Sequence, residues 1–136
     1  MNKPQLVDLL NTALAAAIDL ELAAKQAHWN VKGPNFFSLH QLFDQVYEAS
    51  GEWVDDLAER AVQLGGVAQL PSKPARPVSG NFVAGITERL SAFAEQTRAA
   101  IRAAAELGDD VTSDLFNEIT AGADKQRWMV EAHGQA

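Results

Sequence analysis

The sequence contains no cysteine and only one tyrosine, and acidic residues outnumber basic ones. Without cysteine, the chain cannot form disulfides or thiolate metal sites. No apolar run approaches the roughly 20 residues that a membrane-spanning helix needs. The first residues also lack the basic-then-apolar pattern of a signal peptide. We therefore expect a cytoplasmic protein without a membrane segment.

Charge narrows the class of ligand. The chain has 11 Lys and Arg against 18 Asp and Glu, a formal net charge of −7. Nucleic-acid-binding proteins usually carry a basic patch or tail, whereas an acidic surface attracts cations. The composition therefore favours a cation over a nucleic acid as the binding partner.

Alanine and leucine are common, and glycine and proline gather in a few places, which is typical of long helices. Apolar residues recur at helical spacing in four segments, separated by strong helix-ending signals. The predicted helices span residues 4–31, 36–64, 82–107 and 111–132. The residues expected to cap the last three are Asn35, Asn81 and either Asp109 or Asp110.

The connections predict the topology of a single all-α domain spanning residues 1–136. The first and third connections are short, so each joins two antiparallel neighbours. The middle loop, Val67–Gly80, is rich in proline. Each helix is about 40 Å long, and an extended segment of about 15 residues reaches up to about 50 Å. The loop can therefore cross the bundle, although a loop of this length can also fold back.

The second predicted helix carries a stripe of side chains that bind metals. His40 and Asp44 are four positions apart, as are Asp55 and Glu59, so each pair shares a helix face. At about 100° per residue, all four fall within an arc of about 100°. His28 lies near the end of the preceding helix. Imidazole with carboxylates suits iron, zinc and other divalent metals.

This stripe is too long for one site. His40 and Glu59 lie 19 positions apart, roughly 28 Å along a helix. Two copies of the helix packed antiparallel about a two-fold axis would remove the difficulty, because each end of the stripe then meets the opposite end of its copy.

An axis midway between Ala49 and Ser50 places position 40 opposite position 59 and position 44 opposite position 55. The small residues at this centre, Ala49, Ser50 and Gly51, are expected to let the helices approach closely. The register predicts two equivalent sites per dimer. Each takes the His–Asp pair from one chain and the Asp–Glu pair from the other, and His28 completes it.

Spacing alone leaves a second interpretation open, because either pair by itself is typical of a solvated helix surface. Two observations favour metal. Asp55 and Glu59 are like charges one turn apart, which destabilises a helix slightly unless a cation is present. Intrachain di-iron sites of helix bundles use Glu-x-x-His motifs, and the sequence has none, which favours a site shared between subunits.

Short motifs surround these residues: Lys25–Val31 (KQAHWNV), Leu39–Asp44 (LHQLFD), Asp55–Arg60 (DDLAER) and Gln63–Gly66 (QLGG). Together with Gly33 and Phe36, they resemble the Dps family of bacterial mini-ferritins. The resemblance is dense over residues 19–68 and looser through the last two helices.

The resemblance implies a ferritin-like four-helix bundle with one long crossover loop, assembled into a hollow dodecamer. It implies a ferroxidase that oxidises Fe²⁺, typically with hydrogen peroxide, and stores a ferric mineral inside. Trp29 matches a tryptophan beside the family's site, although a packing role explains it equally well. The implied iron ligands are His28, His40 and Asp44 of one subunit with Asp55 and Glu59 of its two-fold mate.

The sequence departs from the family in two places. Many members bind DNA through a lysine-rich N-terminal tail, whereas Met1–Lys3 holds one lysine and His133–Ala136 none, so DNA binding is not expected. The alternative function is a DNA-associated or structural helical assembly with a vestigial metal site. The middle loop is also shorter than in the family and rich in proline, so we expect no extra helix there.

Acidic residues near the start of the last helix suggest an entry pore for iron. For Asp109 and Asp110, the preference of a helix N-terminus for negative charge is the better explanation. The candidates are Asp109, Asp110, Asp114 and Glu118.

Overall fold

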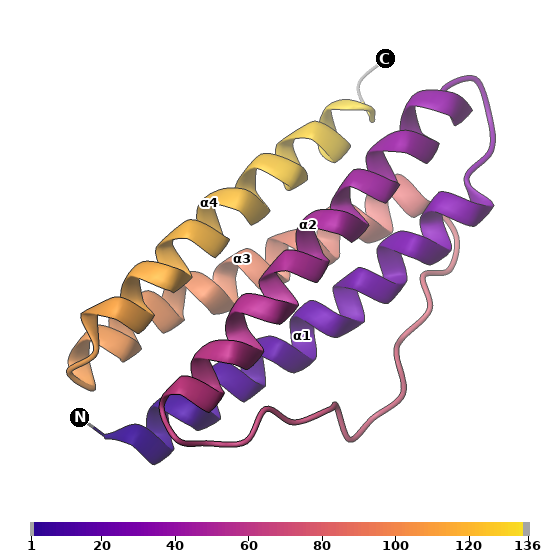
Figure 1. Ribbon diagram of the computed structural model, residues 1–136. Coiled ribbons are helices and arrows are strands. Elements are labelled where there is room, and N and C mark those ends of the chain that lie inside the picture. The colour runs from indigo at the N-terminus through magenta and orange to yellow at the C-terminus, as the bar shows by residue number, and fades with distance from the viewer. Residues whose placement is uncertain (1, 135–136) are drawn as a thin grey trace.

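The computed structural model describes residues 2–134 and contains four long helices. They are α1 (Lys3–Asn30), α2 (Phe36–Gln63), α3 (Phe82–Glu106) and α4 (Asp110–Ala132). The helices α1 and α2 form one antiparallel hairpin, α3 and α4 form another, and the hairpins pack side by side (Figure 1). The predicted all-α bundle is confirmed, and each helix boundary lies within one residue of its predicted position.

Among the described residues, none of the helices is both long and apolar enough to cross a membrane. Met1, Gln135 and Ala136, which belong to the terminal segments expected to lack a basic tail, lie outside the described residues.

Alanine and leucine line the buried face of α1, whereas the other helices supply the aromatic rings of the core. Phe43 and Phe116 are fully buried, and Trp53 stacks on Phe93 with ring centroids 5.5 Å apart. Small side chains let α1 approach α2 closely, which brings polar groups on the two helices within contact distance. The buried alanines of α1 are Ala13, Ala17, Ala23, Ala24 and Ala27.

The middle loop crosses the length of the bundle, as Figure 1 shows, and contains no helix between Gln63 and Phe82. Three polar side chains spaced along α1 hold it. Asn11 bonds the backbone of Val67 and Gln69, and Gln26 bonds both backbone groups of Val78. Between them, Asp19 accepts a hydrogen bond of 2.7 Å from the Arg76 amide. Arg89 of α3 also donates to the carbonyls of Arg76 and Pro77, so the single crossover is fixed by α1 and α3 together.

Two of the predicted helix caps are confirmed. The Asn81 side chain accepts a hydrogen bond from the Ala84 amide, and Asp109 accepts from Val111 and Thr112. The prediction for Asn35 is wrong, because its side chain makes no capping bond. The chain turns instead at Gly33, whose φ of 107° favours glycine, and the Phe36 amide bonds the Gly33 carbonyl.

Asp109 does more than cap α4, because it also joins α4 to α2. Its carboxylate is almost fully buried and pairs with Arg60 at 2.9 Å. It also accepts a hydrogen bond of 2.5 Å from the Thr112 hydroxyl. Burial by itself raises the pKa of Asp109. The hydrogen bonds from Thr112 and Arg60 lower this pKa by more than burial raises it, so it lies below the ordinary value of 3.8.

We expect Asp109→Ala to lower the free energy of unfolding by about 2–4 kcal/mol, because it removes a cap and leaves a largely buried arginine unpaired. A urea titration measures this loss. Asp110→Ala is the matched control: this neighbouring carboxylate is exposed, and its loss is expected to cost less than about 1 kcal/mol. Equal losses in the two variants would contradict the role assigned to the Asp109–Arg60 pair.

The same pair predicts a pH dependence. A carboxyl whose pKa is lower in the folded state stabilises the fold fully above its unfolded pKa of about 4. That contribution is lost as the pH falls through the lower folded-state pKa. The difference in stability between the wild type and Asp109→Ala should therefore shrink below about pH 4.

Candidate metal centre

His28 and His40 meet where α1 and α2 are joined, and they hold each other in place. Their rings stack with centroids 3.8 Å apart and planes 15° apart. Nδ1 of His28 lies 2.5 Å from the His40 carbonyl oxygen, and Nδ1 of His40 lies 2.6 Å from the His28 carbonyl oxygen. Since a carbonyl oxygen can only accept, each Nδ1 carries the hydrogen. In the neutral rings, the lone pair is then on Nε2, which is available to bind a metal.

Phe36 extends this stack, because its ring lies on His40 with a centroid separation of 5.1 Å and an interplanar angle of 26°. His40 is therefore in contact with an aromatic ring as well as with His28. Such packing restricts ring orientation, and the orientation of a histidine ligand affects its affinity for a metal.

We expect Phe36→Leu to weaken Co²⁺ binding to the apo-protein by about 3- to 10-fold, the effect of losing one aromatic contact. The d–d absorption of Co²⁺ measures binding without any oxidation. Phe82→Leu is the matched control, since Phe82 is likewise the first residue of a helix but lies on α3. A similar loss in both variants would mean that Phe36 does not position His40.

Asp44 lies one turn beyond His40 and is paired with a lysine. Lys25 donates to Asp44 Oδ1 at 2.8 Å and lies over the Tyr47 ring, 4.4 Å from its centroid. The hydrogen bond from Lys25 lowers the pKa of Asp44. A metal that uses Asp44 must therefore compete with an ammonium group for this carboxylate.

Asp55 and Glu59 lie farther along α2, on exposed positions of its surface. Within the part of the chain that the structure describes, no group of three or more His, Cys, Asp or Glu side chains is close enough to hold a metal. The structure thus brings together His28 and His40, with Asp44 one turn away, and leaves Asp55 and Glu59 apart from them.

Electrostatics around Asp55 favours a cation. Glu21 of α1 lies against Gly51, where an added Cβ would be 2.9 Å from its carboxylate oxygen. Burial, and then the charge of Asp55, raises the pKa of Glu21. A nearby cation would therefore stabilise the charged form of the Glu21 carboxylate.

The expected surface of small residues at the centre of α2 is largely wrong. Ser50 is fully buried, and its hydroxyl donates to the Val46 carbonyl. Ala49 packs against the core of its own bundle. Only Gly51 remains beside the metal-binding stripe, so close approach at the proposed axis depends on this one residue.

Two further predictions concern Trp29 and the acidic residues near the start of α4. Trp29 is 67% exposed, next to His28 in the sequence, so it is not a packing residue within one chain. Asp109 is wrong as a pore candidate, because it is buried and paired with Arg60. Asp110, Asp114 and Glu118 are exposed at four-residue intervals on α4, and their role in a pore stays a prediction.

Sequence reasoning missed Lys25 and Phe36 as parts of the site. A signal for Lys25 was present, since it precedes His28 by three positions and therefore shares its helix face. The contact between Phe36 and His40 follows the same rule, at a spacing of four.

Comparisons with known proteins extend over nearly the whole chain. Residues 7–135 match the Ferritin family, described as a ferritin-like domain. A relative from Agrobacterium fabrum, named DNA protection during starvation protein, is 37% identical over 98% of this chain and 90% of its own.

Solved structures of Dps proteins share this fold. A Dps protein from Bacillus brevis superposes with a TM-score of 0.87 at 29% identity, over 98% of this chain and 97% of its own. A Dps protein from Vibrio cholerae O1 superposes with a TM-score of 0.88 at 26% identity, over 98% of this chain and 91% of its own. Its description calls it a member of a broad superfamily of ferritin-like diiron-carboxylate proteins.

Proposed function

The chain belongs to the ferritin-like family, among its Dps members, and from this premise we propose that it oxidises Fe²⁺ and stores the ferric product. Family membership supports iron storage and protection against oxidative damage in general terms. The proposal adds the site, shared between two subunits, and hydrogen peroxide as the oxidant. It also adds the assembly, a hollow dodecamer built from two-fold dimers.

The observation that carries the proposal is the reciprocal bonding of His28 and His40. In each ring, Nδ1 donates to the backbone carbonyl of the other histidine, which leaves Nε2 available to bind a metal. Two imidazoles alone bind iron weakly and do not favour the ferric state. Carboxylates favour the more highly charged Fe³⁺, and the two-fold register supplies them as Asp55 and Glu59 of the partner subunit.

Exposure along α2 supports the same register with residues that were not used to choose it. Phe37 and Val62 are 66% and 58% exposed, although both are large and apolar. Their positions, like 40 with 59 and 44 with 55, are equidistant from the proposed axis between Ala49 and Ser50. In the dimer, each Phe37 therefore faces Val62 of the partner subunit. This contact would bury apolar surface at the outer end of each site.

Asp44 provides a second, weaker iron position. Iron at this carboxylate must displace the Lys25 ammonium, which lies 2.8 Å from it. We propose that the first Fe²⁺ binds the imidazoles and that a second enters only after Lys25 has moved. Trp29, exposed beside His28, is placed to shield the site from stray oxidising species once the partner covers it.

Anaerobic loading with Fe²⁺, followed by hydrogen peroxide, tests this function. The protein should take up Fe²⁺, oxidise it on adding peroxide, and retain the ferric iron when the assembly is separated by size-exclusion chromatography. Ferric iron that precipitates outside the protein, at the rate seen in buffer, would contradict both oxidation and storage. Zinc bound in place of iron, without oxidation, would favour a different metal at the same ligands.

DNA binding is not part of this proposal, although relatives are named for DNA protection. The net charge is −7, and phosphate contacts depend on available Lys and Arg. Six of the 11 basic residues are paired with carboxylates of their own chain, namely Lys25, Arg60, Arg76, Arg89, Arg98 and Arg127.

A further inference from the structure

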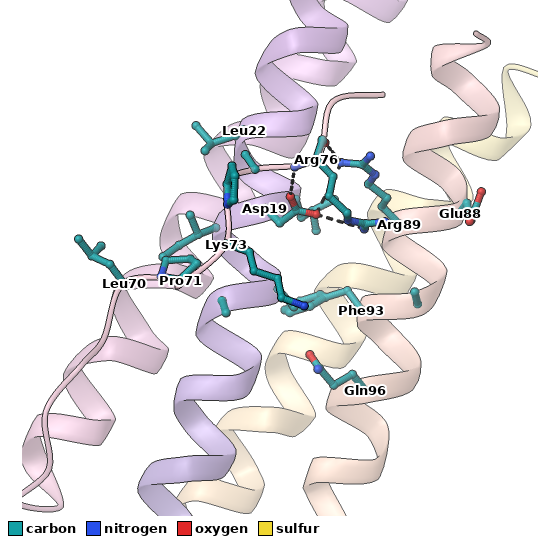
Figure 2. A pocket seen from close by; sticks show the side chains of 17 residues that line it. Asp19, Leu22, Leu70, Pro71, Lys73, Arg76, Glu88, Arg89, Phe93 and Gln96 are labelled. Atoms are coloured by element: carbon teal, nitrogen blue, oxygen red, sulfur yellow. Dashed lines mark hydrogen bonds and ion pairs between the residues drawn. The ribbon is translucent and has the colours of Figure 1, made fainter. Parts of the chain in front are cut away.

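A cavity of about 670 Å³ lies beneath the crossover loop, between α1 and α3 (Figure 2). Neither His28 nor His40 lines it, so it is separate from the candidate metal centre. Its volume falls within the range of roughly 300–1,000 Å³ that is typical of small-molecule sites. The loop that covers it is extended rather than helical and is held to α1 at a few polar contacts, which leaves space beneath it.

The walls of the cavity are mostly apolar. The α1 side is lined by small and aliphatic residues, and the buried ring of Phe93 contributes from α3. Flat apolar surfaces of this kind favour a ligand with an aromatic body. Prominent among the apolar lining residues are Ala15, Ile18, Leu22, Leu70, Pro71 and Phe93.

The charged groups around the cavity leave an excess of positive charge. Three cationic residues and two acidic residues line it. The carboxylate of Asp19 is shared by two arginines, at 3.2 Å from Arg76 and 3.6 Å from Arg89. The side chain of Lys73 reaches into the cavity toward Phe93, as Figure 2 shows, and forms no ion pair with another described residue. In a chain of net charge −7, this is a place where an anion is favoured.

We propose that the cavity binds a small aromatic carboxylic acid, with its ring among the apolar side chains of α1 and the crossover loop and its carboxylate at Lys73. The site is independent of the iron chemistry proposed above, since it shares no residue with it.

Calorimetric titration of the intact protein with 2-naphthoate tests the proposal. We expect saturable binding at one site per chain. Lys73→Gln should weaken this binding by about 3- to 5-fold, whereas Lys125→Gln, which removes an exposed lysine of α4, should leave it unchanged.

Filling the cavity provides a test that does not depend on polar contacts. Ala15→Phe places a ring inside it and should abolish binding, while Ala99→Phe, at an exposed position of α3 outside the lining, should not. Wild-type protein that shows no saturable binding would overturn the proposal, because a neighbouring subunit or a movement of the loop then fills the space. Undiminished binding to a folded Ala15→Phe variant would also overturn it, because the ligand then binds elsewhere.

Discussion

Replacing both His28 and His40 by alanine is expected to slow peroxide-dependent oxidation of Fe²⁺ by about 100-fold or more, because even the outer-shell partners of metal ligands contribute about 10- to 100-fold each. Both imidazoles belong to one chain, and each holds the other through Nδ1. Single replacements should therefore lose much of the same activity. Removing one ring also removes the stacking partner and the ring hydrogen bond that orient the remaining one.

Stopped-flow absorbance of the ferric product, after anaerobic Fe²⁺ loading, measures this loss. His133→Ala is the matched control, because the Nδ1 of His133 also lies close to a backbone carbonyl, that of Met129, at 2.9 Å. The control should retain wild-type rates. Unchanged oxidation in a correctly assembled His28→Ala/His40→Ala protein would remove these residues from the site.

Helix positions could be predicted from the sequence because their signals are local. Glycine or proline interrupts the apolar periodicity at each turn, and the left-handed conformation of Gly33, with φ of 107°, is the physical reason for one such signal. The cap at Asn81 follows from the same kind of local chemistry. Asn35 fails as a cap because its backbone, with ψ of 23°, does not take the extended conformation that directs a side chain at the first amides.

Side-chain partners were harder to predict because they depend on how closely two helices approach. The sequence places His28 and His40 near the same turn, but their reciprocal hydrogen bonds require the alanine-lined contact between α1 and α2. The burial of Asp109 depends on Arg60, which lies 49 residues away in the sequence. Neither pairing has a local signal.

The helical phase of Ser50 could have shown that this residue does not belong to the exposed surface of α2. At about 100° per residue, Ser50 lies roughly on the opposite side of α2 from the arc that contains His40 and Glu59. Residue size suggested close helix approach, whereas helical phase places Ser50 in the core, where it is fully buried. On α2, helical phase is therefore a better guide to the exposed face than side-chain size. The same phase places Phe37 and Val62 on the face that carries the predicted metal ligands.

Mixing two inactive variants is expected to restore activity if the site is shared between subunits. One variant, His28→Ala/His40→Ala, keeps the carboxylates, and the other, Asp55→Asn/Glu59→Gln, keeps the imidazoles. Each site takes imidazoles from one chain and carboxylates from its partner. In a random one-to-one co-assembly, about one site in four therefore combines both intact halves across the two-fold axis. The mixed protein should show about a quarter of the wild-type oxidation rate.

The result separates a shared site from an intrachain one by a large margin. Within a single chain, either variant lacks half of its ligands, so no mixture of the two can build a complete site. Co-expression or refolding together allows the chains to mix, and preassembled variants combined without dissociation provide the control, which should stay inactive. Activity that remains at the level of the parent variants after verified co-assembly would contradict the shared site. The 19 positions between His40 and Glu59, roughly 28 Å along α2, give the physical reason to expect the opposite.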